Sequence, residues 1–298
     1  MAHILQVGAG SGGIVVLDLL ARDPRVDRVT LVEPDVYKLH NVHRHLFPAS
    51  AVGRLKAELA AEWLRERRPD LAVEALAVDL TAPEHQPMIE RAAAACDVGV
   101  CAADNEPAKY HFDQLMRQHG KPWALGEVLS GGIAGWVHRF TPDGPCYGCV
   151  ASYLQRSAPG DPAAPAPDYA DPNGQVRETT VPAGKASIDA VASLHALVTL
   201  DLLNNPSPDP SPKRGGESDG TSPPSLLGKG DGGLGSSDFT SLLFTLARVP
   251  DVFDEPYRTH KFRVPRSLAC LICSAVPAPP GEDLDAALDQ ALARLGHD

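Results

Sequence analysis

The sequence predicts an α/β protein with a doubly wound, mostly parallel sheet and a smaller antiparallel extension. Three observations in the first 33 residues lead to this prediction. An apolar run, HILQV at residues 3–7, ends in a glycine turn. Residues 12–22 then carry apolar side chains at helical spacing. A β-branched segment at 28–33 ends on an acid, which completes a strand, helix, strand unit whose strands run parallel.

Helices and strands continue to alternate along the next hundred residues. We predict an amphipathic helix at 51–68 that is stopped by Pro69, and a helix at 105–119 that is N-capped by Asp104. The strands expected around these helices are 71–78, 97–102, 122–126 and 132–140. The last of these strands alternates in hydropathy, so we expect it at a half-exposed antiparallel edge of the sheet.

The chain after residue 149 is less regular. Residues 156–184 are rich in proline and poor in apolar side chains, which predicts a mobile loop that could act as a lid. Residues 186–203 are apolar on most of a helical circumference, so we expect a helix buried beside the sheet. Residues 205–237 are rich in Pro, Gly and Ser and are expected to be disordered. Short strands are expected at 239–249 and 256–263.

Composition and charge exclude several classes of protein. The 298 residues are 43% hydrophobic and 22% charged, which is typical of a globular protein. A net charge of −11 gives no general attraction for nucleic acid or anionic lipid. The first residues lack the basic segment of a signal or transit peptide, and no apolar stretch approaches the roughly 20 residues that span a membrane. We therefore expect a cytoplasmic protein that binds neither nucleic acid nor membrane.

The glycine turn has the pattern of a phosphate-binding loop. Gly8, Gly10 and Gly13 form G-x-G-x-x-G between a strand and a helix, where small residues let backbone N–H groups approach a phosphate. Glu33, at the end of the second strand, could hold the ribose hydroxyls of either NAD or ATP. At this point an NAD-dependent oxidoreductase fits as well as an enzyme that uses ATP.

The residues that follow Glu33 favour ATP. Asp35, Asn41, Arg44 and Lys56 come directly after the acid. An asparagine, an arginine and a lysine near a glycine loop would donate hydrogen bonds to a triphosphate and to the charge that develops at its α-phosphorus. An NAD-dependent oxidoreductase has no need of this cluster.

Two stretches carry a resemblance to a known family. EPDVYKLHNVHRH, followed by Gly53-Arg-Leu-Lys56, resembles the pattern D-x-D-x-V-x-x-S-N-L-x-R-Q, then G-x-x-K, of the ThiF/MoeB/HesA family of ubiquitin-activating-enzyme-like adenylyltransferases. Cys101-Ala-Ala-Asp104-Asn105 resembles the strand-end D-N of that family, whose aspartate coordinates Mg²⁺ beside the ATP phosphates. One carboxylate beside phosphate oxygens suits Mg²⁺. The alternative for Asp104 is a plain helix N-cap.

Four of the six cysteines form two C-x-x-C pairs, Cys146/Cys149 and Cys270/Cys273. Two such pairs can complete a closed tetrahedral Zn²⁺ site. The stretch VLSGGIAGWVHRFTPDGPCYGC is similar to the strand pair that leads into the first zinc pair of the same family. A redox role is the alternative, which we disfavour because neither pair is expected at the start of a helix after a strand.

The resemblance covers nearly the whole chain except residues 205–237, and it implies a function. It implies adenylation of the C-terminal glycine of a small ubiquitin-like or sulfur-carrier protein ending in Gly-Gly, by a homodimer that uses ATP, Mg²⁺ and Zn²⁺. It assigns catalysis to Asn41, Arg44, Lys56 and Asp104. It assigns ATP binding to Gly8, Gly10, Gly13, Glu33, Asp35, Asn41, Arg44 and Lys56. It assigns Mg²⁺ to Asp104, and Zn²⁺ to Cys146, Cys149, Cys270 and Cys273.

The chain also departs from the family pattern. Some members transfer the carrier to a cysteine in the crossover loop, but only Cys96 and Cys101 remain here, on or beside a buried strand where thiols are usually inert. We therefore expect no thioester step. An arginine that the family takes from the N-terminal segment of the neighbouring subunit is expected to have no counterpart. His45 stands in place of a glutamine, and we expect it on a polar surface loop with His40 and His43.

Two alternative functions stay open. They are a non-catalytic scaffold or partner subunit of the same family and an NAD-dependent oxidoreductase.

The chain is expected to form one domain with an insertion and a tail. We expect residues 1–150 to form a nucleotide-binding, Rossmann-like core and 151–185 the crossover loop. Residues 186–204 and 239–276 complete the same domain, 205–237 form an insertion, and 277–298 form a tail.

Overall fold

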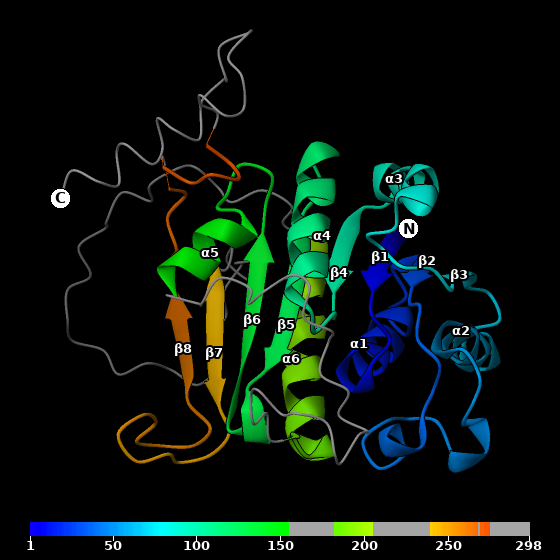
Figure 1. The fold of residues 1–298 in the computed structure, drawn as a ribbon, viewed down its shortest axis with the longest axis horizontal. Helices are drawn as coiled ribbons and strands as arrows, with labels where there is room; N and C mark the ends of the chain where they lie inside the picture. The colour runs from blue at the N-terminus through cyan, green and yellow to red at the C-terminus, as the bar shows by residue number, and fades with distance from the viewer. Residues whose placement is uncertain (155–181, 205–238, 268, 275–298) are drawn as a thin grey trace, which may run out of the picture.

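The computed structural model describes residues 1–154, 182–204, 239–267 and 269–274 (Figure 1). Its eight-stranded sheet has the order β3-β2-β1-β4-β5-β6-β7-β8. The strands are β1 (Ala2–Val7), β2 (Val26–Val32), β3 (Ala72–Leu76), β4 (Val98–Cys101), β5 (Trp123–Val128), β6 (Ala134–Phe140), β7 (Ser241–Thr245) and β8 (Thr259–Phe262). β1 to β5 pair in parallel, and β6, β7 and β8 add antiparallel pairs. The predicted parallel sheet with an antiparallel extension is confirmed.

Helices cover both faces of this sheet. They are α1 (Ser11–Ala21), α2 (Lys56–Arg67), α3 (Gln86–Ala95), α4 (Glu106–Gln118), α5 (Tyr147–Tyr153) and α6 (Lys185–Asn204). The described residues also form short 3₁₀ helices, η1 (Leu39–Asn41), η2 (Ala49–Ala51), η3 (Pro83–His85) and η4 (Ser130–Gly132). α1, α2 and α6 pack in one hydrophobic cluster, and α3, α4 and α5 pack in the other. The sheet is therefore doubly wound.

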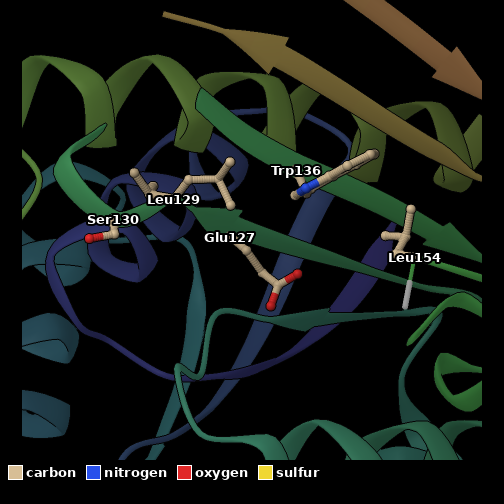
Figure 2. Close-up of a pocket in the computed structure, with 6 residues that line it drawn as sticks. Glu127, Leu129, Ser130, Trp136 and Leu154 are labelled. Carbon is tan, nitrogen blue, oxygen red and sulfur yellow. The ribbon is translucent and has the colours of Figure 1, made fainter. Parts of the chain in front are cut away.

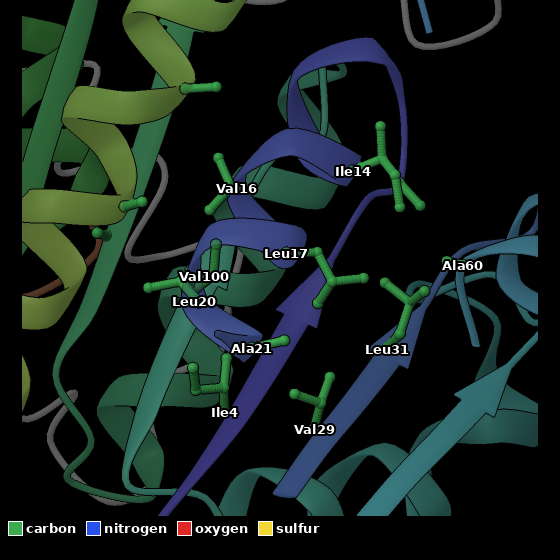
Figure 3. Close-up of a cluster of buried hydrophobic side chains, with 14 of the residues drawn as sticks. Ile4, Ile14, Val16, Leu17, Leu20, Ala21, Val29, Leu31, Ala60 and Val100 are labelled. Atoms are coloured by element: carbon green, nitrogen blue, oxygen red, sulfur yellow. The ribbon is translucent and has the colours of Figure 1, made fainter. Parts of the chain in front are cut away.

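Alternation along the strands produces the two clusters. Side chains of neighbouring strand residues point to opposite faces, so Ile4 contacts one layer of helices and Leu5 the other. Figure 3 shows Ile4 and Leu31 pointing toward Leu17 and Leu20 of α1. All four side chains are fully buried. This packing holds the beginning of α1 at the carboxyl end of β1.

The central strand pair creates a switch point. β1 has β2 on one side and β4 on the other. The connection that follows β1 contains α1 and covers one face of the sheet, whereas the connection that follows β4 contains α4 and covers the other face. In open parallel sheets, ligands bind outside the carboxyl ends of the strands at such a point. Here the glycine turn after β1 and the segment after β4 meet at that edge.

Three local predictions are wrong in detail. α2 begins at Lys56 and not at residue 51, because Gly53 has φ +94° and Leu55 is extended. β6 is antiparallel but lies inside the sheet, because β7 and β8 continue beyond it. The N-cap of α4 is Asn105, whose side chain accepts a 2.8 Å hydrogen bond from the N–H of Ala108. Asp104 does not cap this helix.

α6 matches the predicted buried helix but is longer than expected. By length and composition α6, with 20 residues, is long and apolar enough to cross a membrane. The expectation that no apolar stretch approaches that length is therefore wrong. α6 packs against α1, β5 and β6. A Cβ added at Gly126 of β5 would lie 2.5 Å from Nδ1 of His195. This close packing identifies α6 as a core helix of the sheet.

Three predictions fall largely or wholly on residues outside the described ranges. They are the lid at 156–184, the disorder at 205–237 and the tail at 277–298.

Candidate functional site

The glycine turn combines two crowded glycines with an open one. A Cβ added at Gly8, which has φ +93°, would lie 2.7 Å from the carbonyl of Ala102 after β4. A Cβ at Gly13 would lie 2.5 Å from the carbonyl oxygen of Gly8. A Cβ at Gly10 would meet no atom within 4 Å among the described residues, and no side chain caps α1 at this position. The beginning of α1 is therefore open to an anion, which helix N-termini attract.

Side chains from three segments hold this turn in place. Glu33 Oε2 accepts a 2.5 Å hydrogen bond from the N–H of Ala9, and His45 Nε2 donates to the carbonyl of Ala9 at 3.0 Å. Gln6 Nε2 donates to the carbonyls of Gly8 and Gly13 at 2.9 and 2.7 Å. Sequence reasoning missed Gln6, although a glutamine inside an apolar strand was a visible signal.

His45 is buried, so the expectation that it lies on a polar surface loop is wrong. It is 5% exposed and its ring packs against Phe47 at a centroid distance of 4.6 Å. Burial lowers the pKa of His45 to about 4, so the ring is neutral at pH 7. A neutral ring with its Nε2 proton on Ala9 leaves Nδ1 as an acceptor, and Nδ1 has no partner among the described residues. His43, by contrast, is exposed.

Glu33 is 4% exposed at the end of the second strand. Burial raises its pKa, whereas Lys56 and the N–H groups of Ala9 and Asp35 favour the carboxylate. Its Oε1 accepts from the N–H of Asp35 at 2.9 Å. Both carboxylate oxygens therefore support the backbone around the turn, next to the place where a ribose would lie in a nucleotide-binding site of this type.

The four predicted residues after Glu33 lie in the segment that joins β2 to the first residue of α2. Lys56 is 7% exposed and its Nζ donates to Oδ2 of Asp35 at 2.7 Å. The buried Asn41 accepts a 2.9 Å hydrogen bond from the N–H of Lys38, and Arg44 follows on the next turn. Nε of Arg44 is buried and has no partner in the described part of the chain. Arg44 directly precedes His45, which contacts Ala9 of the glycine turn. Asp35, the partner of Lys56, donates its N–H to Glu33, which also contacts Ala9, so both cations lie near the turn.

Asp104 lies at the same edge and is free to bind a ligand. It is exposed and follows Ala102 and Ala103, which contact Gly8. Asn105, and not Asp104, caps α4. The carboxylate of Asp104 has no hydrogen bond or ion pair within the residues that the structure describes. An unpaired carboxylate beside a phosphate-binding turn could hold a divalent cation.

A buried charged network extends from α4 toward the antiparallel strands. Lys109 is 4% exposed and donates to Oε1 of Glu106 at 2.7 Å and to Oε1 of Glu127 at 2.6 Å. His138 lies 3.3 Å from the other oxygen of Glu127. Tyr147 Oη donates to Oε2 of Glu106 at 2.8 Å. The i,i+3 spacing of Glu106 and Lys109 was visible in the sequence, but the partners on β5, β6 and α5 were not.

A cavity of about 440 Å³ opens beside this network at the carboxyl end of β5 (Figure 2). The described residues that line it are Glu127, Val128, Leu129, Ser130, Trp136 and Leu154. The carboxylate of Glu127 and the aromatic face of Trp136 give it one acidic and one apolar wall. The cavity lies on the same edge of the sheet as the glycine turn, because β5 runs parallel to β1 and β4.

The two cysteine pairs come together. Sγ of Cys146 lies 3.8 Å from Sγ of Cys149 and 3.5 Å from Sγ of Cys270, and Cys149 lies 3.5 Å from Cys273. All four sulfurs lie within 4.8 Å of one another. A tetrahedral ion with bonds of about 2.3 Å requires sulfurs about 3.8 Å apart, so the four residues could hold a metal. The group links α5 to the C-terminal end of the described chain.

Two features of the cysteines bear on their chemistry. Cys146 is the N-cap of α5, which follows β6, so the expectation that neither pair starts a helix after a strand is wrong. Burial opposes ionisation of Cys270, but hydrogen bonds from the backbone of Cys273 and Ile272 lower its pKa to about 7. Thiolates are the form that binds metal. Cys96 and Cys101 are fully buried, and burial raises the pKa of each to about 12.

The sequence is similar to those of known proteins. The model of the ThiF family matches residues 1–217. SAMP-activating enzyme E1 of Haloferax volcanii is 31% identical over 150 residues, which are 50% of this chain and 53% of the relative. Adenylyltransferase and sulfurtransferase MOCS3 of Arabidopsis thaliana is 28% identical over 151 residues, 50% of this chain and 31% of the relative. The chain thus spans about half the length of the first relative and a third of the second.

The fold is similar to that of a solved enzyme. The structure of E. coli MccB with ATP superposes with a TM-score of 0.59 at 15% identity, and it covers 91% of this chain and 66% of that chain. A second structure of E. coli MccB gives a TM-score of 0.62 at 15% identity, over 95% of this chain and 68% of that chain. At this level of identity the likeness concerns the fold.

Proposed function

Because the chain belongs to the ThiF family, we propose that it adenylates the C-terminal carboxylate of a small ubiquitin-like or sulfur-carrier protein that ends in Gly-Gly. One observation carries this proposal. The open face of Gly10, the unpaired carboxylate of Asp104 and the cations Arg44 and Lys56 lie around one edge of the sheet. This set of groups suits a nucleoside triphosphate with a divalent cation.

The proposed roles divide between binding and catalysis. The turn would hold the phosphates of ATP, and Glu33 would hold the ribose. Asp35, Asn41, Arg44 and Lys56 would complete the nucleotide site. The carboxylate of Asp104 is a suitable ligand for Mg²⁺. A bound Mg²⁺ would neutralise part of the negative charge of the phosphates.

The reaction is a substitution at phosphorus. A carboxylate oxygen of the carrier attacks the α-phosphorus of ATP, a carboxylate–phosphorus bond forms, and the bond to the bridging oxygen breaks so that pyrophosphate leaves. Repulsion between the carboxylate and the polyanion opposes this approach. Arg44, Lys56 and Asn41 would stabilise the charge that develops, and positioned donors of this kind contribute a large share of enzymatic acceleration.

We also propose that the four cysteines bind one structural Zn²⁺. The spacing of the four sulfurs supports this assignment. Four protein thiolates would leave no coordination position for a substrate, so the ion would join α5 to the C-terminal segment and take no part in the reaction.

The proposed reaction stops at the acyl-adenylate. The sequence has no cysteine between Cys149 and Cys270, and the remaining thiols, Cys96 and Cys101, are buried with a raised pKa. An external nucleophile would therefore take the acyl group. The cavity beside Glu127 is open at the same edge of the sheet and would receive the tail of the carrier. We propose a cytoplasmic homodimer as the working form, from the family resemblance and the composition.

Exchange of pyrophosphate into ATP tests the proposal. The purified protein with Mg²⁺ and Gly-Gly-ended carriers should catalyse an exchange that requires the intact tail. Asp104→Asn should lower the exchange by about 100-fold or more, and Asp254→Asn, which replaces an exposed acid in the β7–β8 loop, serves as the control. Unchanged exchange in Asp104→Asn would contradict the assignment of Asp104. ATP binding without exchange with any carrier would favour the scaffold alternative.

A further inference from the structure

Lys185 lies beside the nucleotide site although it is far along the chain from the glycine turn. It is the first residue of α6, which packs along α1 (Figure 1). A Cβ added at Gly12, near the beginning of α1, would lie 3.4 Å from Cγ2 of Ile188, one turn after Lys185. The beginnings of α1 and α6 therefore lie next to each other at the carboxyl edge of the sheet.

Three cations lie in the neighbourhood of one buried histidine ring. Lys56, Lys185 and Arg44 are each close enough to His45 for their charges to lower its pKa. The ring of His45 is 5% exposed and contacts the carbonyl of Ala9 in the glycine turn, so these cations lie close to the turn. Nε of Arg44 is buried and has no partner in the described ranges. Lys56 and Lys185 have carboxylate partners that are 63% and 39% exposed. Because solvent screens such partners, the three cations can together attract a further, multiply charged anion.

The carboxylates that pair with Lys56 and Lys185 do not prevent these lysines from binding an anionic ligand. Asp35 pairs with Lys56, and Oδ1 and Oδ2 of Asp189 accept from Nζ of Lys185 at 2.9 and 2.8 Å. The side chains of Lys185 and Asp189 are 34% and 39% exposed. A partly exposed i,i+4 ion pair contributes little to stability. A multiply charged phosphate can therefore replace Asp189 as the partner of Lys185.

The position of Lys185 on its helix supports the same conclusion. The N-terminal end of a helix carries partial positive charge, so a lysine there is unfavourable for the helix itself. The first turn of α6 contains no acidic residue. The N-terminal end of α6 and the ammonium group of Lys185 therefore both attract an anion. The flexible side chain of lysine is suited to contact with phosphate oxygens.

We propose that Lys185 binds the phosphates of ATP and exchanges Asp189 for a phosphate oxygen when the nucleotide enters. The proposal rests on the proposed function, because it requires ATP at the glycine turn. It adds a third cation, from the far end of the crossover region, to Arg44 and Lys56. Lys185 is a binding residue in this proposal, and its contact is with the phosphate chain and not with adenosine.

Equilibrium binding of ATP and AMP with Mg²⁺ tests the proposal on the full chain. Lys185→Met should weaken ATP binding about tenfold and AMP binding less than threefold, because AMP lacks the β- and γ-phosphates. Lys185→Arg should recover most of the affinity. Asp189→Asn, which releases the ammonium, should bind ATP at least as tightly as the wild type. Arg22→Met is the matched control, since Arg22 forms an i,i+4 ion pair with Asp18 on α1 and lies beyond the far end of that helix.

The outcomes separate the two proposals. Wild-type protein that binds no ATP would overturn the proposed function and this inference together. Wild-type exchange of pyrophosphate with unchanged ATP affinity in Lys185→Met would overturn this inference alone. Equal weakening of ATP and AMP in Lys185→Met would also overturn it, because a structural role would not distinguish the two nucleotides.

Discussion

Tyr147 Oη donates a 2.8 Å hydrogen bond to Oε2 of Glu106, which joins α5 to α4. Tyr147 follows Cys146 of the four-cysteine group, and Glu106 comes two residues after Asp104. The other oxygen of Glu106 accepts from Lys109. The proposed zinc site and the proposed magnesium ligand are thus connected through one hydrogen bond and short stretches of backbone.

Tyr147→Phe should loosen this connection without removing either site. Loss of a hydrogen bond to a charged acceptor should lower the free energy of unfolding by about 2 kcal/mol. It should weaken binding of Mg²⁺ and ATP about threefold, while bound zinc stays constant. Urea unfolding, titration calorimetry and metal analysis measure these quantities. Tyr153→Phe, at an exposed position of the same helix, is the control. Nucleotide affinity equal to that of the wild type would contradict the coupling.

Alanine at two positions of the glycine turn should have opposite effects. Gly8→Ala requires a left-handed conformation and places Cβ 2.7 Å from Ala102, so it should destabilise the protein by about 2 kcal/mol or more. Gly10→Ala meets no neighbour within the described residues and should leave the free energy of unfolding within about 0.5 kcal/mol. It should nevertheless weaken ATP binding, because the methyl group enters the open space where phosphates would lie. Gly10→Ala with full ATP affinity would argue against that placement.

The four cysteines should hold one zinc ion per chain under reducing conditions. Cys270→Ala should release the metal and lower the free energy of unfolding by several kcal/mol, on the order of 3. Cys96→Ala, at a buried thiol outside the group, should keep the metal. Elemental analysis and thermal unfolding measure both effects. A metal-free wild type that forms disulfides within the two pairs on mild oxidation would support the redox alternative instead.

Acid should destabilise the protein partly through His45. The pKa of this ring is about 4 in the folded state and 6.5 as the ordinary value, so below pH 6.5 the unfolded chain binds a proton that the folded chain does not. Stability is therefore complete above pH 6.5 and falls as the pH decreases toward 4, by about 2 kcal/mol at pH 5 for this residue. His195, whose pKa is also about 4, adds a similar loss.

His45→Gln isolates the first contribution. The amide can donate to Ala9 as the ring does, but it does not titrate. The difference in unfolding free energy between pH 7 and pH 5, measured in urea, should be smaller than in the wild type by about 2 kcal/mol. His43→Gln at the exposed neighbouring position is the control. An equal difference in His45→Gln and wild type would show that His45 is not buried in neutral form.

Local spacing was enough to predict much of the fold and of the site. The glycine turn, the parallel strands, the helix at α6 and the two cysteine pairs each depend on residues a few positions apart, and the described structure contains all of them. The proximity of Asp35, Asn41, Arg44 and Lys56 follows because they belong to one short segment. Their proposed roles toward ATP came from the family resemblance and stay predictions.

Other features depend on segments that are distant in the sequence. β6 was expected at an edge because its alternation says nothing about the strands that pair with it, and β7 comes from about a hundred residues later. Asp104 and Asn105 are equally good caps by composition, and only the backbone geometry of α4 selects Asn105 and leaves Asp104 free.

Tertiary structure also decided the surroundings of the glycine turn. By itself the sequence determined which chemical groups are present and which short segments could bind a phosphate. The burial of His45 depends on how its loop folds against Ala9 and Phe47. The position of Lys185 near the glycine turn depends on how α6 packs on α1. Packing of this kind sums many weak contacts across the whole chain, so no local pattern predicts which distant side chain completes the site.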